Sequence, residues 1–271
     1  MENLRAALHG DRRVTLDRAT LDLATIEFPE LAPQPYLAIL DDLAADIDAC
    51  LRGARDGTRF VSAANRVLFE RFGLRGNESD YYDPRNSCLN AVLDRKLGIP
   101  ITLSAVYLEV ARRLRRPVFG IGLPGHFLLQ YDDDEYSTFI DPFHAGRLLS
   151  AEDCCSLAKD IAGVDLTNDS AVLKPVSNQY ILMRMLNNLR SAYERLHDYR
   201  KAVAVLDILA EAWPDEAEYF RQRAAARLQL REFVAAGHDF RRYLELSPDA
   251  PDREEIRKQI ASIHRWLGSV N

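Results

Sequence analysis

The residues best suited to chemistry are a cysteine, a histidine and an aspartate in the middle of the chain, Cys88, His126 and Asp141. A thiolate can attack a carbonyl carbon, an imidazole can move the proton, and a carboxylate can orient the imidazole. His126 begins one segment of strand character and Asp141 ends another, so a hairpin between them would bring both side chains to the same end of a sheet. The pattern favours a functional pairing of His126 with Asp141.

The nucleophile that would complete this set is less clearly marked. Asn86 is a good helix N-cap, which places Cys88 in the first turn of the expected helix, where a thiol pKa can be lowered. A free cysteine is also commonly a small buried hydrophobic residue, and both interpretations stay open for Cys88. Thr102 and Ser104, in the next expected helix, are alternatives that would need strong activation by His126.

A metal site is a further alternative. His126, Asp141 and His144 have suitable ligand types, although their spacing matches no specific zinc motif. The chain contains no GxxxxGK[ST], GxGxxG or HExxH pattern, so phosphate-cradling and metalloprotease functions are not indicated. The sequence therefore implies no cofactor.

The elements that would position these residues predict an α+β domain. Apolar residues recur at helical spacing in residues 37–51 and again in residues 101–114, and the second stretch is expected to be a central buried helix. Three short segments rich in β-branched and aromatic residues follow at 118–121, 126–131 and 137–140, separated by turn formers. Helices followed by a small antiparallel sheet form an α+β domain, not a doubly wound one.

Composition limits the class of protein and its partners. At 271 residues the chain is long enough for two domains, and a net charge of -6 argues against unspecific binding to nucleic acid. Four cysteines, two of them adjacent, suit a reducing compartment better than a disulfide framework. No signal peptide or bilayer-spanning run is recognised, so we expect a cytoplasmic protein that is not in the membrane. The oligomeric state stays open.

The C-terminal part of the chain repeats with an offset of 34 residues. Equivalent positions match as Leu196 with Leu230, Tyr199 with Phe233, Ala202 with Ala236, Leu206 with Phe240, Leu209 with Tyr243 and Pro214 with Pro248. This period and pattern resemble tetratricopeptide repeats, in which each unit is a helix hairpin that buries its apolar face against its neighbour. We place the domain junction in the polar segment 166–170, giving domains of residues 1–170 and 171–271.

Several separated motifs also resemble the bacterial SirB-type family. They are Asn86-Ser87-x-Leu89-Asn90, Gly98-Ile99-Pro100-Ile101-Thr102-Leu103, Pro124-Gly125-His126-Phe127 and Asp141-Pro142-Phe143. The resemblance covers nearly the whole chain. It implies a transglutaminase-like, papain-like domain followed by tetratricopeptide repeats.

The resemblance also bears on function. The wider transglutaminase-like superfamily uses a Cys-His-Asp triad, which maps the histidine onto His126 and the aspartate onto Asp141. The thiol of that superfamily heads the helix before the first strand of the sheet, and residues 100–104 contain no cysteine. The preferred hypothesis is a degenerate active site in a protein that binds a peptide or partner protein through its cleft or its repeats. The alternatives are a cysteine-dependent amide hydrolase or acyltransferase and a metal-binding protein.

Overall fold

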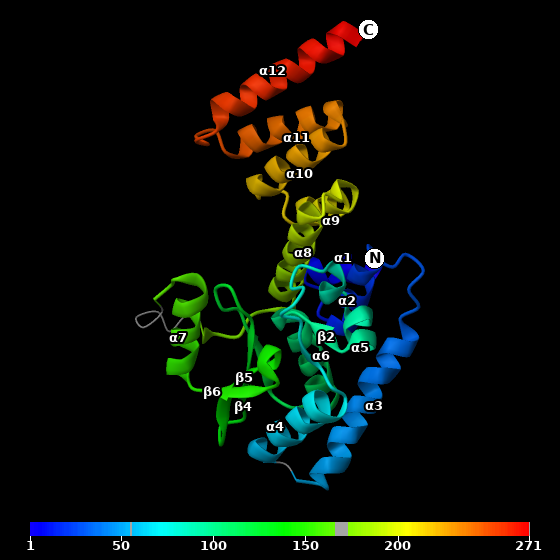
Figure 1. Ribbon diagram of the computed structural model, residues 1–271, viewed down its shortest axis with the longest axis vertical. Coiled ribbons are helices and arrows are strands. Elements are labelled where there is room, and N and C mark those ends of the chain that lie inside the picture. The colour runs from blue at the N-terminus through cyan, green and yellow to red at the C-terminus, as the bar shows by residue number, and fades with distance from the viewer. Residues whose placement is uncertain (55, 166–172, 271) are drawn as a thin grey trace. The chain divides into compact units, whose positions relative to one another are not determined.

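The computed structural model describes residues 1–54, 56–165 and 173–270, which divide into two compact units, Met1–Met185 and Leu186–Asn271 (Figure 1). The expected junction at residues 166–170 lies outside the described residues. Within the described ranges, no helix is long and apolar enough to cross a membrane.

Helices make up most of the first unit. Its elements outside the main sheet are α1 (Glu2–Leu8), α2 (Leu16–Ala24), α3 (Gln34–Leu51), α4 (Gly57–Asn65), the π-helix η1 (Arg66–Arg71), β1 (Arg75–Gly76), the 3-10 helix η2 (Pro84–Ser87), α5 (Leu89–Arg95), β2 (Leu97–Gly98), α6 (Pro100–Arg113), the 3-10 helix η3 (Pro142–His144) and α7 (Ala151–Ala162). The apolar residues of α3 at helical spacing are all buried, as their pattern predicts. Helix α6 is buried along almost its whole length and is the central helix of the unit.

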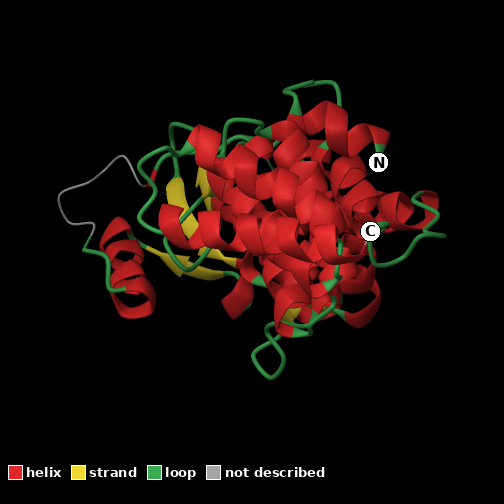
Figure 2. Cartoon of the chain, turned by 90° about the horizontal axis from the view of Figure 1, so that it is seen from above, coloured by secondary structure: helices red, strands yellow, loops and turns green. Residues whose placement is uncertain are grey.

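The main sheet has four antiparallel strands in the order β3 (Val118–Ile121), β4 (Leu128–Asp132), β5 (Ser137–Asp141) and β6 (Arg147–Leu149). Alternate residues of β4 pack into two different hydrophobic cores. Leu128 packs with α7, whereas Leu129 and Tyr131 pack with α3, α4 and α6. The sheet therefore lies between α7 and the helical core (Figures 1 and 2). This architecture confirms the predicted α+β fold class.

The helix expected to start at Asn86 begins later. Residues 84–87 form η2, and Cys88 is the N-cap of α5. The side chain of Asn86 is fully buried, and its amide nitrogen donates to the backbone oxygens of Asp80 and Tyr81 at 2.7 and 3.2 Å. Its side-chain oxygen accepts a hydrogen bond from Asn77 at 3.0 Å. The N-cap prediction for Asn86 is wrong because this side chain organises the preceding loop.

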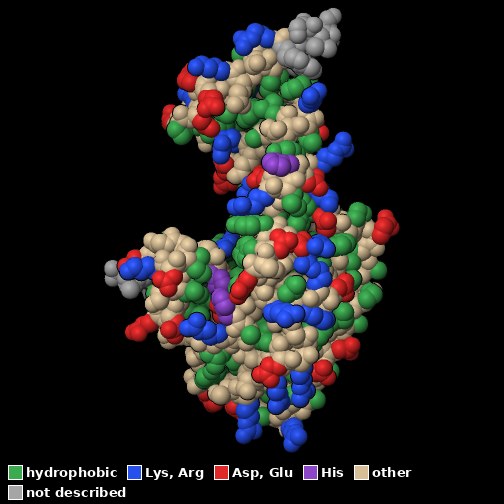
Figure 3. Space-filling model, in the orientation of Figure 1, with side chains coloured by type: hydrophobic (Ala, Val, Ile, Leu, Met, Phe, Trp, Pro, Cys, Tyr) green, Lys and Arg blue, Asp and Glu red, His purple; other side chains and the backbone are tan. Residues whose placement is uncertain are grey.

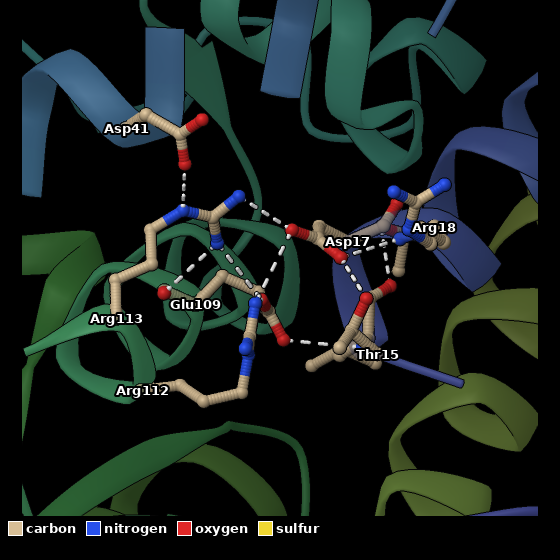
Figure 4. Close-up of polar contacts among 9 residues, drawn as sticks. Thr15, Asp17, Arg18, Asp41, Glu109, Arg112 and Arg113 are labelled. Atoms are coloured by element: carbon tan, nitrogen blue, oxygen red, sulfur yellow. Dashed lines mark hydrogen bonds and ion pairs between the residues drawn. The ribbon is translucent and has the colours of Figure 1, made fainter. Parts of the chain in front are cut away.

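A partly buried ion network joins α2 and α3 to α6 (Figure 4). The guanidinium of Arg113 contacts Asp17 at 2.7 Å, Asp41 at 2.6 Å and Glu109 at 3.0 Å. Arg112 adds a 2.7 Å contact with Glu109. Asp17 and Glu109 are buried, so their charges need these partners. The network fixes the helix that underlies the sheet.

The second unit is helical. Helix α8 (Asn178–Arg195) starts in the first unit and continues into the second, and α9 (Tyr199–Ala212), α10 (Ala217–Gln229), α11 (Phe233–Leu246) and α12 (Arg253–Val270) follow. The period of 34 recurs in the backbone: His197 and Arg231 precede α9 and α11 with φ of 57° and 60°. Trp213 and Ser247, the C-caps of those helices, share φ of -129° and ψ of 74°. These helix hairpins confirm the predicted repeat region.

Candidate functional site

His126 and Asp141 meet at one end of the main sheet. Asp141 is the last residue of β5, and His126 lies in the turn before β4, directly after Gly125, whose φ is +71°. The Nε2 atom of His126 lies 3.1 Å from Oδ1 and 3.0 Å from Oδ2 of Asp141. Both side chains are buried, with 4% and 2% of their surface exposed. The structure therefore brings together the two residues that the hairpin argument pairs.

The carboxylate of Asp141 is held by more than one partner. Its Oδ1 accepts hydrogen bonds from the backbone N–H groups of Phe143 and His144 at 3.0 and 3.4 Å, which caps η3. Its Oδ2 lies 2.7 Å from Nδ1 of His144. Burial alone would raise the pKa of Asp141, but hydrogen bonds and charge interactions with His126 and His144 bring that pKa below its usual value. We call these three residues the His-Asp-His cluster.

An aromatic ring lies against this cluster. The Phe143 ring meets His126 edge to face, with ring centroids 6.1 Å apart, and His144 in the same way at 5.2 Å. Tyr81 packs against Phe143 at 6.1 Å. A Cβ atom at Gly76 would lie 2.6 Å from the Phe143 ring, so β1 leaves space for that ring only because residue 76 is glycine.

Arg184 of α8 is a residue of the site that sequence reasoning missed. Its guanidinium donates to the backbone oxygens of His126 at 3.3 Å and Leu123 at 3.5 Å. These bonds fix the turn that carries His126. No local pattern indicates this role, because 58 residues separate Arg184 from His126.

Cys88 lies in a different cluster. Its side chain is fully buried with Ala24 of α2 and Ala91 of α5, and Phe28 packs against the group. The Sγ atom is 3.6 Å from the backbone oxygen of Pro84, to which the thiol can donate. The surroundings of Cys88 are those of a small core residue.

The two alternative nucleophiles are also buried. Thr102 and Ser104 both lie in α6 with 0% of their surface exposed. Neither hydroxyl has a hydrogen-bond partner within the part of the chain that the structure describes. A hydroxyl needs an adjacent base to become a nucleophile, and neither hydroxyl is bonded to one here.

A second candidate site is a pocket of about 430 Å³ in the second unit, which we call the repeat pocket. Residues of α8, the start of α9 and α10 line it: Arg190, Glu194, Tyr199, Arg221, Gln222, Ala225, Ala226 and Gln229. Nε of Arg190 and Oε1 of Gln222 are buried atoms of two of these residues, and neither atom has a hydrogen-bond partner among the described residues. Two of the residues that line the pocket therefore each carry a buried polar atom without a partner among the described residues.

Both parts of the chain match known sequence families. The family model described as "Transglutaminase-like superfamily" matches residues 34–187. The model described as "Tetratricopeptide repeat" matches residues 189–261. With the α+β unit and the helix hairpins, these matches define the class of protein: a transglutaminase-like domain followed by tetratricopeptide repeats.

Relatives match along most of the chain. A UPF0162 protein of Xylella fastidiosa (strain Temecula1) is 34% identical over 93% of this chain and 91% of its own length. A UPF0162 protein of Pseudomonas aeruginosa is 30% identical over 92% of this chain and 90% of its own length. The chain therefore belongs to the transglutaminase-like superfamily and, within it, to the UPF0162 family. Human F-box only protein 21 is 31% identical over 59% of this chain, which is 26% of that protein.

Proposed function

We propose that this protein binds a peptide or a partner protein, and that its transglutaminase-like domain does not use Cys88 as a nucleophile. The observation that carries the proposal is the packing of Cys88. A thiol nucleophile must lie within hydrogen-bond reach of its imidazole base. The Cys88 thiol faces the backbone oxygen of Pro84 and packs with Ala24 and Ala91 in a buried cluster. This arrangement is what a degenerate active site of the SirB type would have.

The repeat pocket supports the binding half of the proposal. Arg190 bonds Glu194 through Nη1, and the Gln222 amide nitrogen bonds Glu218, so each side chain is held in place by one end. Within the described ranges, the Arg190 Nε–H donor and the Gln222 Oε1 acceptor have no hydrogen-bond partner. Each residue of a peptide, proline excepted, offers one C=O and one N–H, which match this donor and acceptor. Because both atoms are buried, a ligand reaches them only when the two side chains turn toward the pocket; it then removes the cost of leaving them unbonded.

Alkylation by iodoacetamide tests the statement about Cys88. Cys50 is partly exposed and serves as the internal reference in the same chain. We expect Cys88 to react more slowly than Cys50 at every pH, and His126→Ala to leave the Cys88 rate unchanged, as measured by peptide mass spectrometry. Faster alkylation of Cys88 with an apparent pKa well below about 8.5, lost in folded His126→Ala protein, would instead support the cysteine hydrolase alternative.

Selection from a displayed random peptide library on the full-length protein tests the binding statement. Selected peptides should bind the parent protein and lose at least about tenfold in affinity to Arg190→Met, because one buried donor is lost. Arg257→Met on α12 is the matched control, since the Arg257 side chain is exposed and contacts Glu254 outside the pocket. Enrichment of no sequence, or equal binding to all three proteins, would contradict the proposal.

A further inference from the structure

The charge partners of Asp141 differ from those of every other buried acid that the structure describes. The buried acidic residues are Asp17, Asp83, Glu109, Asp141 and Asp239. Four of them contact arginine: Asp17 and Glu109 contact Arg113, Asp83 contacts Arg85 and Arg95, and Asp239 contacts Arg223 and Arg227.

Asp141 has no arginine partner among the described residues. Its ion-pair contacts in the described ranges are with His126 and His144 alone. An imidazole carries a full charge only when it is protonated, whereas a guanidinium is always charged. Buried charges in proteins are generally paired or coordinate a metal ion. Among the described residues, Asp141 is therefore the buried acid whose ion-pair partners are both imidazoles, which are also metal ligands.

The donor atoms of the His-Asp-His cluster converge on one point. Nε2 of His126 and Nδ1 of His144 lie 3.0 and 2.7 Å from the same oxygen, Oδ2 of Asp141. One ligand atom from each of the three residues lies within 4.8 Å of the others. Zinc binds histidine nitrogen and carboxylate oxygen at about 2.0 to 2.2 Å, so an ion between these atoms needs only a small opening of the cluster.

Hydrogen bonds already hold two of these residues, Asp141 and His126, in position. Oδ1 of Asp141 accepts from the backbone N–H groups of Phe143 and His144, which orients the carboxylate with Oδ2 near both ring nitrogens. Arg184 holds the backbone of His126. In known sites, ligating carboxylates are oriented by hydrogen bonds such as those that Oδ1 accepts. His144 has 45% of its side chain exposed, so its ring can adjust and an ion can enter from solvent. Figure 3 shows histidine side chains grouped at the visible surface of the first unit.

We propose that His126, Asp141 and His144 bind one divalent transition-metal ion, with Zn²⁺ as the first choice. Two histidines and one carboxylate are a donor set that suits zinc and other first-row divalent ions, and three protein ligands leave a coordination position open. The ion replaces the hydrogen bonds between the rings and Oδ2. Each imidazole then carries its proton on the nitrogen that faces away from the ion, Nδ1 in His126 and Nε2 in His144.

Calorimetric titration with Zn²⁺ and absorption spectroscopy with Co²⁺ test the site. The full-length protein is first stripped with a chelator, and its accessible thiols are alkylated so that Cys50 and Cys155 do not compete. We expect one equivalent of metal to bind, and His144→Ala to weaken binding at least tenfold. His144 is suited to substitution because it is the exposed member of the cluster.

His238→Ala is the matched control, because His238 is an exposed histidine in α11 of the second unit. It should bind metal as the parent does. Absence of metal binding in the parent, or equal binding by the parent and His144→Ala, would overturn the proposal. Peptide selection by the repeat pocket is independent of this result, so the two proposals can fail separately.

Discussion

Replacement of Arg113 by methionine is the perturbation for which the structure gives the clearest magnitude. The substitution keeps the apolar stem but removes the charge that contacts Asp17, Asp41 and Glu109. Asp17 and Glu109 have only 2% and 3% of their side chains exposed, so they cannot recover their hydration. Removing one partner from a buried ion pair costs about 3 to 5 kcal/mol. Because Arg112 still contacts Glu109 at 2.7 Å, we expect the lower end of that range, about 3 kcal/mol.

Hydrogen exchange followed by mass spectrometry measures this loss where it occurs. A loss of about 3 kcal/mol corresponds to roughly 100-fold faster exchange in α6 peptides, since about 1.4 kcal/mol is a factor of ten. Both tryptophans, Trp213 and Trp266, belong to the second unit, so tryptophan fluorescence shows whether that unit is unaffected. Asp41→Asn is the control, because Asp41 is 67% exposed and its ion pair should contribute less than about 1 kcal/mol. Equal exchange in Arg113→Met and Asp41→Asn would refute the reasoning.

The loss of stability caused by Arg113→Met should depend on pH. Burial opposes ionisation of Asp17, but hydrogen bonds from Thr15 and Arg113 and the charge of Arg113 hold the Asp17 pKa below its usual value. Stability from such a group is present above the unfolded pKa of about 3.9 and is lost as pH falls through the folded pKa. The difference in unfolding free energy between parent and Arg113→Met should therefore shrink as pH falls below about 4, measured by urea unfolding. Burial raises the pKa of Glu109, and loss of the Arg113 charge favours its protonation further, so its contribution to the difference has the same sign as that of Asp17.

Three further substitutions test single contacts. Tyr107→Phe removes a buried hydroxyl that has no partner among the described residues, so the melting temperature should stay constant or rise; a fall would show that the hydroxyl is bonded. Gly76→Ala puts a Cβ 2.6 Å from the Phe143 ring and should cost about 1 to 3 kcal/mol, measured by calorimetry, and an unchanged melting temperature would contradict the packing. Asp239→Asn removes the buried charge that faces two arginines of α10 and should cost about 3 kcal/mol, measured by unfolding followed by tryptophan fluorescence; an unchanged stability would contradict the pairing.

The fold was largely predictable because its signals are local. The apolar spacing in α3 and α6, the β-branched segments of β3 to β5 and the offset of 34 all lie within short windows of sequence. The parallel pair β1 and β2 was not predictable, since strands of two residues carry no period. The N-cap at Asn86 failed because its amide binds a loop that precedes it by several residues.

The candidate site was predictable only where sheet topology determines it. Neighbouring antiparallel strands bring the start of one to the end of the other, which is why the proximity of His126 and Asp141 follows from the sequence. The contact of Arg184 with the His126 backbone depends on how α8 packs, and no periodic pattern contains it. The unpaired ends of Arg190 and Gln222 likewise appear only once neighbouring side chains are in place. Roles for Cys88, His126 and Asp141 in catalysis stay a prediction.

The same backbone conformations recur after 34 residues in the second unit, and this regularity affects how the repeat region could change in length. His197 and Arg231 have the same left-handed conformation, and Trp213 and Ser247 have the same dihedral angles, each pair 34 residues apart. Equivalent turns of the two hairpins therefore share one backbone conformation. Duplication of one 34-residue segment would present the same apolar face to each new neighbour, so the repeat region could grow or shrink by whole units while the main sheet and its histidines kept their sequence.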